Sequence, residues 1–122
     1  MKVLTLFLLL TISAHSEIYA QSQFKLDPSQ SMLMTGKGAG QDGARNPYSG
    51  KDCAAVVQNL KESTFSIRIQ QDGELVKVIQ VESKETVMVF LPKGHELYID
   101  TNTNEEVNFD LTFEKASNYI DG

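Results

Sequence analysis

The chain is poor in the residue types that bring special chemistry. Its 122 residues include one cysteine, two histidines, three prolines and no tryptophan. A single cysteine excludes an intramolecular disulfide framework and a cysteine-based zinc cluster. Basic residues are also the minority, since eleven lysines and arginines face sixteen acidic residues and give a formal net charge of −5. That balance argues against a protein that binds nucleic acid, because such binding depends on neutralising phosphates.

The first twenty residues have the layout of a secretory signal peptide. Lys2 supplies a positive start, an apolar run follows over residues 3–12, and a polar stretch leads to Ala20. We expect cleavage after Ala20, with Ser16 as the alternative site. Ten apolar residues span about 15 Å as a helix, half of a bilayer core of about 30 Å, so no permanent membrane span is expected. The sequence therefore predicts a periplasmic or secreted protein.

Apolar and polar residues alternate with a period of two along most of the remaining chain. This alternation is typical of β-strands that bury one face. Asp72-Gly73 separates two such runs and predicts a tight hairpin, because both central positions of the favoured turn need a positive φ. Residues 86–91 are apolar at nearly every position, which predicts a strand buried on both faces. The expected strands cover residues 24–26, 31–35, 53–60, 65–70, 75–81, 86–91, 95–100 and 107–114.

These seven or eight strands, without any segment of helical period, predict a single all-β domain over residues 21–115. The fold class that we expect is a small antiparallel β-sandwich, either immunoglobulin-like or a jelly roll. Residues 116–122 are expected to form a flexible tail. From His95 onward the chain has seven acidic residues and one basic residue, Lys115, so its last quarter predicts an acidic surface.

Residues 36–52 form the least ordinary segment, with five glycines among seventeen residues. The glycine-rich loop contains the string Gly38-x-Gly40-x-x-Gly43, which resembles a dinucleotide fingerprint only in its letters. That fingerprint requires a helix after the glycines, and here Pro47 follows instead, so nucleotide binding is not expected. One interpretation is a flexible crossing between sheets, and the other is a loop that binds a partner. In the second case the contacting residues would be Lys37, Arg45, Tyr48 and Lys51, which include residue types that contribute strongly to interfaces.

A weak calcium-loop pattern begins at Asp100. Asn102 and Asn104 stand at the third and fifth positions, as in such loops, but the sixth position is Glu105 where a glycine is required. Asparagines are also common at ordinary hairpin tips. An irregular oxygen cage remains conceivable, and its ligands would be Asp100, Asn102, Asn104 and Glu106.

Cys53 could serve as a nucleophile, with His95 as its base. A thiolate nucleophile needs a base within hydrogen-bonding distance, and nothing in the sequence brings these two residues together. An unpaired cysteine that begins an apolar strand is more typically a small buried residue. A disulfide between two copies through Cys53 is a second alternative, because an odd cysteine in an exported protein can pair between chains. Serine hydrolysis is disfavoured, since no Gly-x-Ser-x-Gly motif occurs.

The sequence thus predicts a small exported, non-catalytic binding protein without a cofactor. A protein partner would contact the glycine-rich loop and the acidic strands near the C-terminus. Inhibitors, immunity-type proteins and subunits of a cell-envelope assembly all fit this description. A calcium-dependent structural or adhesive β module is the alternative, and a small hydrolase comes third.

Overall fold

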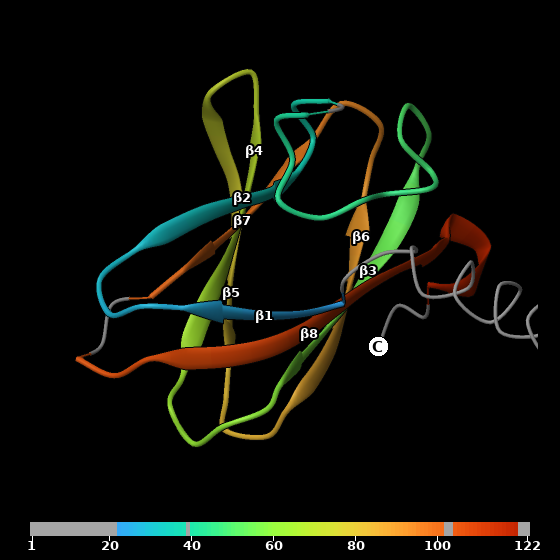
Figure 1. Ribbon diagram of the computed structural model, residues 1–122. Coiled ribbons are helices and arrows are strands. Elements are labelled where there is room, and N and C mark those ends of the chain that lie inside the picture. Colours follow the sequence, from blue (N-terminus) through green and yellow to red (C-terminus); the bar gives the residue numbers. More distant parts are fainter. Residues whose placement is uncertain (1–21, 39, 102–103, 120–122) are drawn as a thin grey trace, which may run out of the picture.

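The protein, described by a computed structural model over residues 22–38, 40–101 and 104–119, is an all-β sandwich (Figure 1). Two antiparallel sheets of four strands each pack face to face. The predicted signal peptide lies outside the described residues. The strands are β1 (Gln23–Leu26), β2 (Ser31–Thr35), β3 (Cys53–Asn59), β4 (Phe65–Gln71), β5 (Glu74–Val81), β6 (Thr86–Leu91), β7 (Glu96–Asp100) and β8 (Val107–Lys115).

All eight expected strands are present at the predicted places. The β4–β5 hairpin is also confirmed, because Asp72 and Gly73 both adopt positive φ values of 51° and 81°. This backbone geometry matches the right-handed twist of the two strands that it joins. The period of two in the sequence therefore corresponds to alternating burial, as in β4, where Phe65, Ile67 and Ile69 are buried between half-buried neighbours.

The strand pairing identifies a jelly roll and excludes the immunoglobulin-like alternative. The first strand pairs with the last, β2 with β7, β3 with β6, and β4 with β5. This nested set of pairs is one long hairpin rolled into two sheets, with orders β1-β8-β3-β6 and β2-β7-β4-β5. Only the β4–β5 connection stays within one sheet. Every other connection crosses the sandwich, so the loops gather at its two ends (Figure 1).

The core lies between the inner faces of the two sheets. Phe109 on β8 is fully buried, and its ring lies 5.5 Å from the ring of Phe24 on β1 and 5.5 Å from that of Phe65 on β4. The three aromatic rings thus connect the two sheets. The other buried core residues are Leu26, Met34, Ala44, Cys53, Ala55, Val57, Ile67, Ile69, Val81, Val89, Leu91, Leu97, Ile99, Val107 and Leu111.

The prediction that residues 86–91 are buried on both faces is wrong. β6 is an edge strand of its sheet, and Thr86 is exposed while Met88 and Phe90 are half-buried. The outer face of this strand is covered in part by the chain that follows β8. A short 3-10 helix, Ala116–Asn118, packs against β3, and the ring of Tyr119 lies 5.6 Å from that of Phe90. The remaining residues of the expected tail, 120–122, lie outside the described part of the chain.

Within the described residues, no helix is long and apolar enough to cross a membrane.

Replacing the central core ring tests this packing. We expect Phe109→Ala to lower the free energy of unfolding by about 3–5 kcal/mol, because it removes a buried ring and leaves a cavity between the sheets. The measurement is urea unfolding followed by circular dichroism. Thr112→Ala, on the exposed face of the same strand, is the matched control and should change stability by less than about 0.5 kcal/mol. Equal effects of the two substitutions would contradict the proposed role of the ring.

Candidate functional site

The glycine-rich loop crosses from β2 in one sheet to β3 in the other and is fixed against the edge of β2. The backbone N–H of Gly43 donates to the carbonyl of Leu33 at 3.0 Å, and that of Ala44 donates to the carbonyl of Met34 at 2.9 Å. The side chain of Ala44 is buried in the core. The loop therefore covers this sheet edge and supplies part of the core, in addition to connecting the sheets.

The carboxylate of Asp42 organises the first turn of the loop. It accepts hydrogen bonds from the backbone N–H groups of Gly36, Lys37 and Gly38 and from the hydroxyl of Thr35, at 2.9–3.2 Å. Short acidic side chains favour such bonds to nearby backbone groups. The four bonds hold this carboxylate against the backbone of the turn.

Gly36 lets the loop pass close to the start of β7. A Cβ atom at this position would lie 2.6 Å from Glu96 Cα and 2.6 Å from the His95 carbonyl oxygen, and the φ of 121° also favours glycine. The next residue, Lys37, forms an ion pair of 2.9 Å with the Glu96 carboxylate, whose side chain is only 7% exposed. The hydrogen bond to Glu96 and its negative charge raise the pKa of Lys37.

Asn46 fixes the second half of the loop. Its side-chain oxygen accepts the backbone N–H of Tyr48 at 2.9 Å, and its Nδ2 donates to Cys53 Sγ at 3.5 Å. Burial raises the pKa of the Cys53 thiol, an effect that the Asn46 hydrogen bond opposes and the Asp52 charge reinforces. A thiol in this environment is held in its protonated, weakly nucleophilic form.

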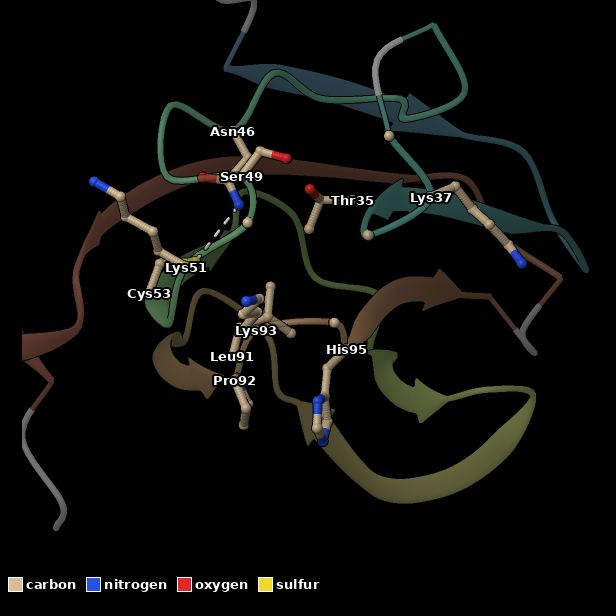
Figure 2. Close-up of a pocket in the computed structure, with 14 residues that line it drawn as sticks. Thr35, Lys37, Asn46, Ser49, Lys51, Cys53, Leu91, Pro92, Lys93 and His95 are labelled. Atoms are coloured by element: carbon tan, nitrogen blue, oxygen red, sulfur yellow. Dashed lines mark hydrogen bonds between the residues drawn. The ribbon is translucent and has the colours of Figure 1, made fainter.

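A cavity of about 300 Å³ lies where the glycine-rich loop meets the turn between β6 and β7 (Figure 2). Lys93 in that turn is held by a hydrogen bond from its backbone N–H to the Asp52 carboxylate at 2.8 Å. The loop is thus linked to the turn by Asp52 and to the start of β7 by the Lys37–Glu96 pair. The cavity is lined by Thr35, Gly36, Lys37, Gly38, Asn46, Ser49, Gly50, Lys51, Cys53, Leu91, Pro92, Lys93, Gly94 and His95.

Cys53 and His95, which the sequence could not bring together, line this same cavity. Their side chains nevertheless do not form a nucleophile–base pair. Cys53 Sγ is hydrogen-bonded to Asn46, and Figure 2 shows the ring of His95 pointing away from the thiol. The Nδ1 atom of His95 is buried and makes no hydrogen bond with a described residue. With Cys53 only 1% exposed, a disulfide between two copies would also require the loop to open.

Two of the four predicted contact residues, Lys37 and Lys51, line the cavity, and two do not. Arg45 is exposed elsewhere on the loop, while Tyr48 is half-buried and packs against the core. Sequence reasoning missed the contribution of Lys93. The turn signal Pro92-Lys93-Gly94 was visible, but only the sheet topology places this turn beside the loop.

Two residues of the weak calcium pattern are bound to basic side chains. Asp100 receives two hydrogen bonds from Arg68, at 2.7 and 3.0 Å, and Glu106 is paired with Lys25 and Lys61 at 3.3 and 3.2 Å. Asn102 lies outside the described residues. Within the described part of the chain, no group of three or more acidic, histidine or cysteine side chains could hold a metal ion.

Asp100 belongs instead to an ordered array on the outer face of the second sheet. Arg68 stacks over the ring of Tyr98, with 4.1 Å between the guanidinium carbon and the ring centroid, and Ser31 also donates to the Asp100 carboxylate. Burial alone would raise the pKa of Asp100. The hydrogen bonds from Arg68 and Ser31, together with the positive charge of Arg68, outweigh burial and lower this pKa.

Comparisons with known proteins support the fold alone. No protein-family model matches the sequence, and neither does any curated protein. Among solved structures, PirA is similar with a TM-score of 0.58 and 12% sequence identity over 79% of this chain and 94% of that chain. The cupin domain of Drosophila melanogaster CENP-C has a TM-score of 0.45 and 12% identity, over 75% of this chain and 58% of that chain. The likeness to PirA shows a similar fold and nothing about activity.

The Asp42 turn can be tested through the reactivity of the thiol that the loop covers. We expect Asp42→Ala to increase the labelling rate of Cys53 by a thiol reagent about tenfold or more, because loss of four hydrogen bonds promotes local opening. Gln41→Ala, at the exposed neighbouring position, is the control and should label like the wild type. The hypothesis fails if Asp42→Ala leaves the labelling rate unchanged.

The Arg68–Asp100 pair predicts a pH-dependent contribution to stability. Because the pKa of Asp100 is lower in the folded state, the stabilisation is present above the ordinary carboxyl pKa of about 3.9 and is lost as the pH falls through the folded-state value. Asp100→Asn should lower the free energy of unfolding by about 1 kcal/mol at pH 7, and the difference from wild type should shrink near pH 3. Urea unfolding at both pH values measures this difference. Asp72→Asn at the hairpin turn is the control, and a pH-independent effect of Asp100→Asn would contradict the prediction.

Proposed function

We propose that this protein is a small exported, non-catalytic binding protein that recognises an acidic surface on a protein partner. The proposed contact surface consists of the glycine-rich loop and the β6–β7 turn, residues 92–94. The charge arrangement at this end of the sandwich supports the proposal best. Export, to the periplasm or outside the cell, is inferred from residues 1–20.

Three of the four basic side chains in these two segments are free of ion pairs with described residues, Lys37 being paired with Glu96, whereas both acidic side chains accept hydrogen bonds from the backbone. Arg45, Lys51 and Lys93 are exposed and make no ion pair with any described residue. The carboxylates of Asp42 and Asp52 accept backbone N–H groups. A locally positive surface on a chain of net charge −5 favours docking of a complementary acidic patch and increases the association rate.

The construction of the loop also supports binding. Its hydrogen bonds to β2 and its buried Ala44 fix the backbone before a partner arrives, so little conformational entropy is lost on association. The cavity between loop and turn offers a recess for one partner side chain. A protein ligand is favoured over nucleic acid because the net charge of the whole chain is negative. Inhibitors, immunity-type proteins and subunits of an envelope assembly all remain within this proposal.

The test is capture of partners from the cell-envelope and extracellular fractions of the parent organism. We expect Lys51→Glu/Lys93→Glu to recover at least about tenfold less of the specific partner, because both substitutions oppose an acidic surface. Lys84→Glu/Lys115→Glu makes the same change in net charge outside the two segments and should recover the partner normally. Equal recovery by the two double variants would overturn the proposed surface.

A further inference from the structure

The cavity between the glycine-rich loop and the β6–β7 turn carries charge of one sign. Among the described residues, 14 line it, and these include three lysines but no acidic residue. Lys51 and Lys93 are exposed and form no ion pair with a described residue. The carboxylates of Asp42 and Asp52, in the surrounding loop, accept backbone N–H groups instead of lining the cavity. A concave surface with this charge attracts an anionic group.

Neutral hydrogen-bond donors line the same cavity. Gly50 and Gly94 stand in turns with φ values of 84° and 85°, and their backbone N–H groups make no hydrogen bond to a described residue. The hydroxyl of Ser49 likewise has no partner in the described part of the chain. Turns of this kind can present N–H groups to an anion. The cavity therefore offers uncharged donors beside the ammonium groups of Lys51 and Lys93.

The floor of the cavity is apolar. Cys53 and Leu91 are 1% and 3% exposed, and Pro92 beside them is half-buried. Figure 2 shows Leu91 and Pro92 of the turn across the cavity from Ser49 of the loop. An apolar floor below a rim of donors suits a group that has an aliphatic stem and an anionic head. Phosphate and sulfate ions have no such stem, whereas an acidic side chain has one.

We propose that this cavity binds the side chain of a glutamate on the protein partner, a site that rests on the function proposed above. The two methylene groups of the glutamate lie against Cys53 and Leu91. Its carboxylate pairs with Lys93 and accepts hydrogen bonds from Gly50 and Gly94, directly or through one water molecule. With these partners the carboxylate leaves bulk water without becoming an unpaired buried charge.

A site of this kind makes recognition depend on shape as well as on charge. Two charged surfaces attract each other in many orientations and are screened by salt, whereas a side chain held in a recess orients the partner. Asp42 and Asn46 hold the backbone of the loop, so the recess is formed before the partner arrives. The cavity thus gives the protein a means to select one acidic partner among others.

The direct test is a titration of the purified, isotope-labelled protein with acetyl-glutamate amide, followed through its backbone amide NMR signals. We expect saturable shifts of the Gly50 and Gly94 signals within tens of millimolar of this probe. Acetyl-glutamine amide has the same stem and an uncharged head, so it should bind at least about tenfold more weakly. Inorganic phosphate should also bind more weakly because it lacks the stem. Equal responses to the two amino-acid probes, tighter binding of phosphate, or no shift of these signals would overturn the proposal.

Filling the cavity separates this site from the function on which it rests. Ser49→Tyr adds a ring at the exposed rim without changing any charge, and it should lower recovery of the partner at least about tenfold. Thr112→Tyr adds the same ring on the exposed face of β8 and is the matched control. Both positions are exposed, so both variants should keep the circular dichroism spectrum and thermal midpoint of the wild type.

The two possible failures give different results. If Lys51→Glu/Lys93→Glu loses the partner while Ser49→Tyr recovers it normally, the proposed function stands and the glutamate site is wrong. If the lysine variant also recovers the partner normally, the proposed function fails and the glutamate site fails with it.

Discussion

The nested pairing of strands is the constraint on which the rest of the structure depends. Because β3 pairs with both β6 and β8, the segment before β3 must return to the end of the sandwich where β6 turns into β7. That return brings the glycine-rich loop beside Lys93 and His95, and the cavity results. The two sheets form the rigid support, and the loop carries the polar and basic side chains that face solvent.

The electrostatics of the molecule follow from how its acidic groups are used. Asp42 and Asp52 stabilise backbone N–H groups, and Asp100 holds Arg68 on the outer sheet face. Each of these carboxylates supplies hydrogen bonds that hold a loop, a turn or a side chain of the sheet face in place. The basic groups of the loop that form no ion pair therefore make the surface there positive, although the chain as a whole is acidic.

The strands could be predicted from the sequence because their signal is local. Alternation along residues 107–114 and the Asp72-Gly73 pair determine strand and turn without reference to distant residues. The neighbours of each strand are set by contacts across the whole chain, so neither the jelly-roll order nor the shared cavity of Cys53 and His95 could be predicted. For the same reason the apolar run of residues 86–91 predicted a strand buried on both faces, whereas β6 is an edge strand whose outer face Tyr119 partly covers. The four hydrogen bonds of Asp42 could not be predicted, because no sequence signature distinguishes this aspartate from the other aspartates of the chain.

The pairing of Phe24 on β1 with Phe109 on β8 has a consequence for how the chain acquires its structure. The first strand to emerge from a ribosome or a translocation channel must wait for the last one before its sheet can close. Contacts of such long sequence separation make folding slow, and the sheet can close only after β8 has been synthesised. Until β8 has been made, β1 has no partner strand in its sheet.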